Sequence, residues 1–206
     1  MKQLILASQS PRRKELLSQL GYQFITLAAD IDETVQVNED AYDYVTRLAK
    51  EKAQAIFATL PYERQVDSIV IGSDTSVVIE NEILGKPADE AECIAMLQRL
   101  ENKLHQVLTA VAVISHNQQC ETITKLVETQ VQFKPLSLGE IKRYWSTGEP
   151  CDKAGSYAIQ GIGGQVVTTI NGSYSAVFGL PLYVVFYTQL TIPTKSISQL
   201  ERVSFT

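Results

Sequence analysis

Short apolar runs alternate along the chain with stretches whose apolar residues recur at helical spacing. The runs typical of strands are LILAS (4–8), YQFITL (22–27), SIVIGSD (68–74), SVVIE (76–80), VLTAVAVIS (107–115), VETQVQF (127–133) and QVVTTI (165–170). The helical patterns cover 12–20, 41–58, 88–100 and 138–146. Because the two kinds of segment interleave, the sequence predicts an α/β fold of mixed α+β type with a mixed central sheet. In 127–133 polar and apolar residues alternate, as they do in a half-exposed antiparallel strand.

The length of 206 residues fits one large domain or one domain with two lobes. The sequence shows no internal repeat and no low-complexity tract. Its last residues, IPTKSISQLERVSFT, are typical of a surface tail. We therefore predict a single domain over residues 1–190 and a C-terminal tail over 191–206.

Composition narrows the class of protein. With 45% hydrophobic and 20% charged residues the chain is an ordinary globular protein, and its formal charge of −5 opposes capture of nucleic acid or of an anionic membrane. The longest apolar run, 176–187, is too short to span a bilayer, and the N-terminus lacks the pattern of a secretory signal. We expect a soluble cytoplasmic protein. Three widely spaced cysteines indicate neither a disulfide framework nor a zinc site.

The first candidate site lies where the first strand gives way to a helix. Ser10 is a typical N-cap and Pro11 suits the first helical position, so free N–H groups lie beside Ser8, Arg12 and Arg13. Such a helix start can hold a phosphate group. A capped surface helix with solvated arginines is the alternative.

An acidic cluster follows the second predicted strand. Asp30, Asp32 and Glu33 provide hard carboxylate oxygens of the kind that hold Mg²⁺ together with substrate phosphates. The alternative is an acidic loop that introduces the next helix.

The helix over 41–58 carries a lysine on its apolar face. Val45, Leu48, Ala49 and Ile56 lie on one face, and Lys52 lies in the middle of it. A buried charge is costly unless it is paired, so Lys52 either extends to solvent or points into a cleft.

The segment from 67 to 89 contains the most informative residues. A buried strand is predicted to end at Asp74, where α/β proteins often build sites, and a carboxylate there can hold a metal or accept a proton from water. The alternative for Asp74 is a cap. Lys86 lies in a tight Gly-Lys-Pro turn, which presents it to a ligand or only to solvent.

Five glycines between 155 and 172 allow close approach of backbone to a ligand, although turns use glycine as well. Among them, Gln160 offers both a donor and an acceptor to the edge of a nucleotide base.

Taken together, these motifs resemble the Maf family of nucleoside triphosphate pyrophosphatases, which was first named for a link to septum formation. The resemblance rests on SxSPRR, DET, RLAKEKA, GSDTSVV, ILGKP and DKAGSYAIQGIGG, which follow one another in the family's order within residues 3–190. Ser73, Gln9 and the loop before His105 depart from the common pattern, but no charged site residue is lost.

The resemblance implies a fold like that of the inosine triphosphate pyrophosphatases, with an elongated mixed sheet and two lobes around a deep cleft. It implies cleavage of the α–β phosphoanhydride to a nucleoside monophosphate and pyrophosphate, with Mg²⁺ or Mn²⁺ as cofactor. The branch that it resembles acts on dTTP and UTP, and its members are often homodimers.

The resemblance also implies roles for single residues. Asp74 matches the proposed proton acceptor, and Arg12, Thr75 and Gln160 match positions that set substrate preference. Lys52, Lys86 and Glu33 match residues at the phosphate and metal end, where Glu33 and Asp74 would hold the metal.

Three alternatives remain at this stage. A 7-methyl-GTP pyrophosphatase would use the same phosphate chemistry, and a non-catalytic nucleotide-binding regulator of cell division would bind without turnover. A nucleic-acid-binding protein is suggested only by the basic run 12–14 and is opposed by the acidic balance of the chain.

Overall fold

A seven-stranded mixed sheet forms the centre of the computed structural model, which describes residues 2–116 and 121–191. The strands run in the order β2-β1-β3-β5-β6-β7, and β4 pairs with β3. β1, β2 and β3 are parallel, and the other pairs are antiparallel. The bounds are β1 Gln3–Ala7, β2 Phe24–Leu27, β3 Ser68–Ile79, β4 Glu82–Leu84, β5 Leu104–Ser115, β6 Glu121–Phe133 and β7 Val167–Asn171. The predicted mixed α/β fold is confirmed.

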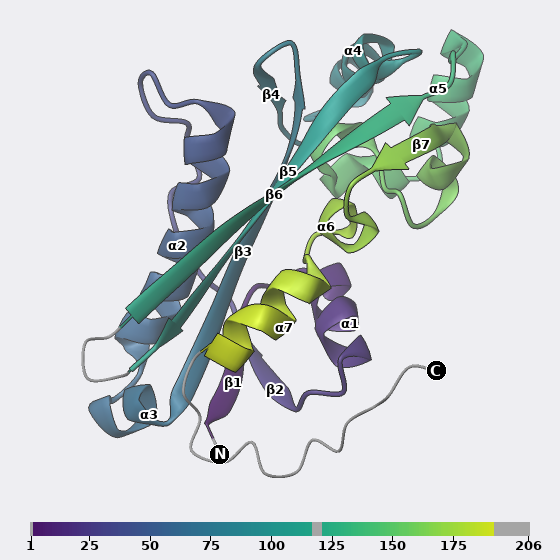
Figure 1. The fold of residues 1–206 in the computed structure, drawn as a ribbon. Helices are drawn as coiled ribbons and strands as arrows, with labels where there is room; N and C mark the ends of the chain where they lie inside the picture. The colour runs from purple at the N-terminus through teal and green to yellow at the C-terminus, as the bar shows by residue number, and fades with distance from the viewer. Residues whose placement is uncertain (1, 117–120, 192–206) are drawn as a thin grey trace.

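The long strands β3, β5 and β6 run through the whole molecule and twist about one another (Figure 1). β1 and β2 lie at one end of them, and β4 and β7 lie at the other end. Each long strand therefore contributes residues to both ends of the fold.

Seven α-helices cover the sheet in the described part of the chain. They are α1 Pro11–Gln19, α2 Ala41–Thr59, α3 Tyr62–Val66, α4 Glu90–Leu100, α5 Leu138–Trp145, α6 Tyr174–Phe178 and α7 Leu182–Thr191. The 3-10 helices are η1 Glu149–Asp152, η2 Ala154–Ser156 and η3 Ile162–Val166. The four predicted helical patterns correspond to α1, α2, α4 and α5. The apolar run 176–187 is divided by Gly179, whose φ of 120° ends α6.

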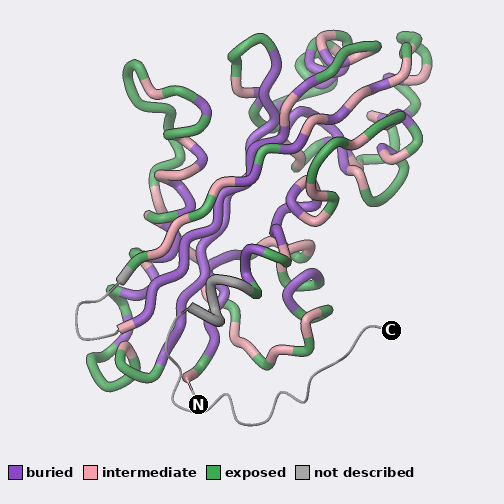
Figure 2. Tube along the Cα trace, viewed as in Figure 1, coloured by how far each residue is buried: buried purple, intermediate pink, exposed green. Residues whose placement is uncertain are grey.

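Three apolar clusters pack against the sheet. One joins β1 and β3 to α1, α6 and α7, and a second joins the opposite face of the same strands to α2. The third lies at the other end, among β3, β5, α4 and α5. Figure 2 shows buried residues along the middle strands and exposed residues on the outer helices and turns.

The prediction that Asp74 lies at a strand end is wrong. The runs 68–74 and 76–80 form one continuous strand, β3, and Asp74 pairs with Ala110 of β5 in the middle of it. The polar residues there do not break the strand because their side chains find partners: Ser73 Oγ lies 2.9 Å from the carbonyl oxygen of Ala110, and Asp74 pairs with Lys52.

The other edge of β3 is open around Asp74. β1 pairs with β3 only as far as Ile71, and β4 begins to pair at Val77. Between these two pairings, residues 72–76 face a gap among the strands that the structure describes. The site lies in this gap.

Within residues 2–116 and 121–191, no helix is both long enough and apolar enough to cross a membrane. The predicted tail over 191–206 lies, apart from its first residue, outside the described residues.

Candidate active site

A cleft of about 1100 Å³ opens beside the middle of β3. Segments from across the chain line it: the end of β1, the start of α1, the loop before α2, the turn after β4 and the segment from 149 to 160. Of the site residues predicted from the sequence, Asp32 alone lies outside this lining, which contains Ser8, Ser10, Arg12, Arg13, Asp30, Glu33, Lys52, Asp74, Thr75, Lys86 and Gln160.

Lys52 joins two carboxylates in the centre of the cleft. Its Nζ lies 2.7 Å from Asp74 Oδ1 and 2.7 Å from Glu33 Oε1. The Lys52 and Asp74 side chains are about one-tenth exposed, whereas half of Glu33 is exposed. The prediction that Lys52 is either solvated or turned into a cleft is resolved in favour of the cleft.

The two carboxylates are held in different environments. Burial raises the pKa of Asp74 above its ordinary value, although the charges of Lys52 and Arg13 act in the opposite direction. Partial burial also acts to raise the pKa of Glu33, but the Lys52 hydrogen bond and the charges of Lys52 and Lys86 outweigh it and lower that pKa. Asp74 is therefore the carboxylate that more readily accepts a proton.

The start of α1 is built as the sequence predicts. Ser10 is the N-cap and accepts from Arg13 N at 3.5 Å, and Pro11 occupies the first turn. Ser8 Oγ accepts from Ser10 N at 3.1 Å. The cap fixes the helix start at the rim of the cleft.

Arg13 is held by the protein itself. Its Nε donates to the carbonyl oxygen of Gly179 at 2.9 Å, and its Nη2 donates to Thr75 Oγ1 at 3.2 Å. These bonds fix the direction of Arg13, which the sequence left open, and tie the start of α1 to the residue that follows α6.

The hydroxyl of Thr75 belongs to a short chain of hydrogen bonds. Thr109 Oγ1 lies 2.8 Å from the carbonyl oxygen of Ala176 and 3.1 Å from Thr75 Oγ1. Because a hydroxyl has one proton and the carbonyl can only accept, Thr109 donates to Ala176 and receives the proton of Thr75. Thr75 then presents a lone pair, rather than a proton, to any further partner.

Arg12 and Lys86 differ from the other cations of the cleft. Within residues 2–116 and 121–191, neither makes a side-chain hydrogen bond or ion pair. Arg12 is half-buried and Lys86 is exposed. Both side chains line the cleft and are available to an anionic ligand.

Several cleft residues were missed by the sequence analysis. Asp152 and Lys153 form an ion pair in the lining, Tyr44 donates to the carbonyl oxygen of Glu33 at 2.9 Å, and Glu149 lies behind the glycine-rich segment. The residues 152 and 153 belong to the DKAG motif, whose order along the chain was the available signal. Asp32, in contrast, lies outside the lining and accepts from Thr34 N.

The balance of basic and acidic side chains in the lining indicates whether the cleft needs a metal ion to bind a triphosphate. Its five basic side chains face six carboxylates, so the cleft alone cannot neutralise a triphosphate. No group of three or more His, Cys, Asp or Glu side chains gathers as a metal centre in the described parts of the chain. Mg²⁺, however, commonly takes only one or two carboxylates and shares substrate oxygens. Glu33 and Asp74 fit that need in kind: they are two neighbouring carboxylates, each of which pairs with Lys52 through only one of its oxygens.

Comparison with known proteins shows which proteins this chain is similar to. The sequence model of the family described as "Maf-like protein" matches residues 3–189. The chain is 61% identical over 182 residues to the dTTP/UTP pyrophosphatase of Colwellia psychrerythraea. The aligned residues cover 88% of this chain and 84% of the relative. It is 56% identical over 184 residues to the dTTP/UTP pyrophosphatase of Pseudoalteromonas atlantica, covering 87% and 92%.

Among solved structures, one similar chain is a nucleoside-triphosphatase / dITP/XTP pyrophosphatase from Mycobacterium abscessus. It is 12% identical, with a TM-score of 0.40 over 66% of this chain and 76% of that chain.

Proposed function

Because the chain belongs to the Maf family, we propose that it is a nucleoside triphosphate pyrophosphatase that hydrolyses dTTP and UTP to the monophosphate and pyrophosphate. Three relatives that are 61%, 56% and 54% identical over the aligned residues are named for that activity. The observation that carries the proposal is the buried Asp74–Lys52 pair, which lies beside Glu33 in a cleft large enough for a nucleotide.

In the proposed reaction Asp74 accepts a proton from the attacking water. Burial raises its pKa, which makes it a better proton acceptor than an ordinary carboxylate. Lys52 holds the carboxylate in place through its 2.7 Å hydrogen bond, so that the base does not have to be oriented during the reaction.

The unpaired cations of the cleft bind the phosphates. Arg12 and Lys86 neutralise charge on the triphosphate, and the N–H groups at the start of α1 add to the positive potential there. Arg13, which is held by Gly179 and Thr75, shapes this wall and adds its charge. Transfer at phosphorus depends mainly on such positioning and electrostatic stabilisation.

A divalent metal ion, Mg²⁺ or Mn²⁺, is part of the proposal. Glu33 and Asp74 would hold it, and when bound it would supply positive charge to the phosphate oxygens. The excess of carboxylates in the lining supports this requirement.

Base recognition is assigned to Thr75 and Gln160. Thr75 offers a lone pair, and Gln160 offers a donor and an acceptor on an exposed amide. The ring N–H of thymine and uracil is a donor, which suits the lone pair of Thr75.

The test is a substrate panel with the Asp74→Asn variant. The protein should release pyrophosphate from dTTP and UTP with Mg²⁺ and turn over 7-methyl-GTP poorly. Asp74→Asn should lower kcat/KM by about 10²- to 10⁴-fold, the usual contribution of a general base. In the unaltered protein kcat/KM should rise with pH as Asp74 ionises, because only the carboxylate form can accept a proton.

Asp32→Asn is the matched control, since Asp32 is exposed and lies outside the cleft lining. It should leave kcat/KM and the pH profile unchanged. Substantial turnover by Asp74→Asn would remove Asp74 as the base. Nucleotide binding without any pyrophosphate would instead indicate a regulator. Preferred cleavage of 7-methyl-GTP would place the protein in the other branch.

The homodimer, the link to septum formation and the absence of nucleic-acid binding, all expected from the sequence, stay predictions.

A further inference from the structure

The backbone of the segment 158–163 is held at both ends by hydrogen bonds to two side chains, those of Glu149 and Tyr144. Tyr144 and Glu149 hydrogen-bond to this backbone at residues 158, 162 and 163, and Gln160 lies between these points of attachment. None of the motifs singled out in the sequence includes Glu149 or Tyr144 as a functional residue.

Glu149 accepts three hydrogen bonds. Its Oε2 accepts from Ile162 N at 2.9 Å, and its Oε1 accepts from Gly163 N at 2.8 Å and from Tyr144 OH at 2.7 Å. Partial burial acts to raise the pKa of Glu149, but these donors outweigh it and hold the pKa below the ordinary glutamate value. The carboxylate is therefore charged at neutral pH and satisfies the backbone after Gln160.

Tyr144 fastens the backbone before Gln160. Its hydroxyl oxygen accepts from Ala158 N at 3.1 Å while its proton goes to Glu149. Its ring is buried in the apolar cluster among α4, α5 and β5. The pair thus ties both flanks of Gln160 to a packed core.

The glycines of the segment are required by this contact. A Cβ at Gly161 would come closer than 3.0 Å to the Glu149 carboxylate, and one at Gly163 would come closer than 3.0 Å to Tyr144 OH. Gly161 also has a φ of 137°, which disfavours other residues. Gly161 and Gly163 allow the backbone to lie against Glu149 and Tyr144, whereas the other glycines of this part of the chain lie against other residues.

The side chain of Gln160 has little support of its own. Its Nε2 lies 3.4 Å from Glu15 Oε1, a long hydrogen bond on an exposed residue. The position from which its amide reaches into the cleft is consequently determined by the backbone that carries it.

We propose that Glu149, supported by Tyr144, is a positioning residue for substrate selection. It holds residues 158–163 in the one conformation that presents the Gln160 amide to the base. This inference rests on the proposed function, in which Gln160 contacts the base. Both oxygens of Glu149 are already engaged by Tyr144, Ile162 and Gly163, so in this proposal it supports the segment and does not contact the phosphates.

The test is the Glu149→Gln variant. In this variant the side-chain oxygen of Gln can still accept from Gly163 N, but its NH₂ group then faces the N–H of Ile162. One hydrogen-bond acceptor is lost, and two donors oppose each other. The ratio of kcat/KM for dTTP to that for GTP should fall about tenfold or more, with the KM for dTTP raised and kcat within about threefold. Tyr144→Phe removes both of its hydrogen bonds and should lower the same ratio.

Glu101→Gln is the matched control. Glu101 Oε2 also accepts from a backbone amide, Leu136 N at 3.0 Å, but it lies outside the cleft lining. This variant should keep the dTTP to GTP ratio of the unaltered protein. Circular dichroism of the three variants checks that each is folded.

Two readouts separate this inference from the proposed function. Amide hydrogen exchange at Ile162 and Gly163 should accelerate in Glu149→Gln, and the preference for dTMP over GMP in metal-free binding should decrease. Faster exchange with unchanged preference in both assays would overturn the inference. Absence of pyrophosphate release by the unaltered protein would overturn the proposed function, while the binding preference would still test the role of Glu149.

Discussion

At the scale of single residues, His105 is a buried group that the cleft does not use. Its ring is 2% exposed, its Nε2 lies 2.9 Å from Tyr157 OH, and Phe133 packs against it edge to face with centroids 4.9 Å apart. Burial lowers the pKa of His105 to about 4, although the backbone of Lys103 acts to raise it. The histidine is therefore neutral in the folded protein at pH 7.

This pKa predicts a dependence of stability on pH. An unfolded histidine titrates near pH 6.5, so between about 6.5 and 4 the unfolded chain binds a proton that the folded chain does not. Stability falls as the pH decreases through this window. From pH 7.5 to 5, the free energy of unfolding should fall by about 2 kcal/mol more in the unaltered protein than in His105→Gln. Urea unfolding at the two pH values measures the difference.

His116→Gln is the control, because His105 and His116 are the only histidines of the chain. It should keep the pH dependence of the unaltered protein. Equal slopes for His105→Gln and the unaltered protein would contradict the prediction.

Residues differ in how far the sequence can predict them. The inward direction of Lys52 follows from its place on an apolar helix face, because helical periodicity is a local property. The place of Asp74 in mid-strand does not follow, because it depends on Lys52, which lies on another element. Glu149 could not be found either, since its partners are backbone amides 13 and 14 residues away and carry no side-chain signature.

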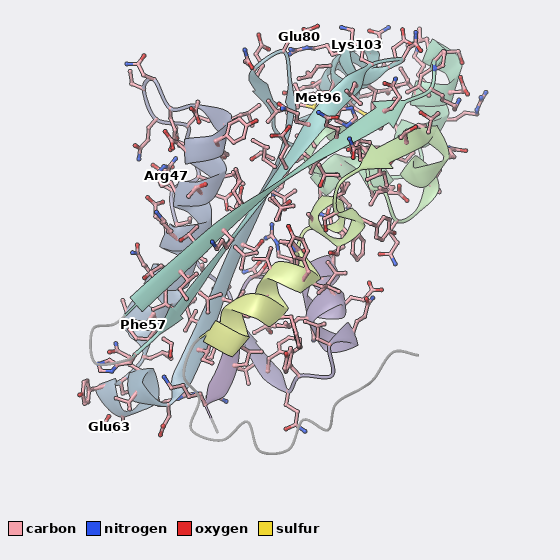
Figure 3. All side chains as sticks on the ribbon, in the orientation of Figure 1. Arg47, Phe57, Glu63, Glu80, Met96 and Lys103 are labelled. Atoms are coloured by element: carbon pink, nitrogen blue, oxygen red, sulfur yellow. The ribbon has the colours of Figure 1, made fainter. Side chains whose placement is uncertain are left out.

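At the scale of elements, the contact of α2 with β3 places Lys52 over Asp74. Gly72 lies in this contact: a Cβ there would be 2.7 Å from Ala53 N and closer still to the carbonyl oxygen of Ala49. The backbone of α2 can approach the strand because residues 49, 53 and 72 are small. Figure 3 shows α2 beside the sheet, with Arg47 and Phe57 marking its two halves.

Gly72→Ala should therefore separate α2 from β3. Overpacking of this kind costs about 1–3 kcal/mol of unfolding free energy, and the displaced helix should carry Lys52 away from Asp74 and lower the turnover of dTTP. Thermal unfolding and the pyrophosphate assay measure the two effects. Gly139→Ala is the control: a Cβ there meets only Arg143 Nη1, at 3.8 Å, and both stability and turnover should be retained.

Elements were predictable where their own pattern is strong. The amphipathic helices α2 and α4 match their predicted ranges closely, whereas the alternating pattern over 127–133 predicted only the second half of β6. The three-residue strand β4 was missed because so short a segment has no period, and it exists only through its pairing with β3. The division of β3 into two predicted strands arose because polar residues 73–76 resemble a turn, while their hydrogen-bond partners lie elsewhere in the fold.

At the scale of the whole molecule, distant segments meet at the cleft. Arg13 and Gly179 are joined by a hydrogen bond across 166 positions of sequence, and Gly155 N donates to Gly85 O at 2.9 Å. No spacing along the chain could predict these contacts. The order of the motifs identified the site, but only the sheet brings its parts together.

The long strands also bear on whether the two ends of the molecule unfold together. β3 contributes two residues to each of the three apolar clusters, and β5 contributes to all three as well. Loss of either end would expose part of the same strands. We therefore predict one cooperative unfolding transition, as expected for a single domain over residues 1–190.

Two probes and two variants test this prediction. Trp145, the only tryptophan, packs against the cluster at the α4–α5 end, whereas far-ultraviolet circular dichroism reports on helices at both ends, including the long α2. Their urea midpoints should coincide.

Leu97→Ala at the α4–α5 end and Leu17→Ala in α1 each remove a fully buried side chain. Each should lower the free energy of unfolding by about 2–5 kcal/mol. Each should shift both probes equally, because either loss destabilises the shared strands. A Leu97→Ala protein whose fluorescence midpoint moves while its dichroism midpoint stays would show that the ends unfold as separate units.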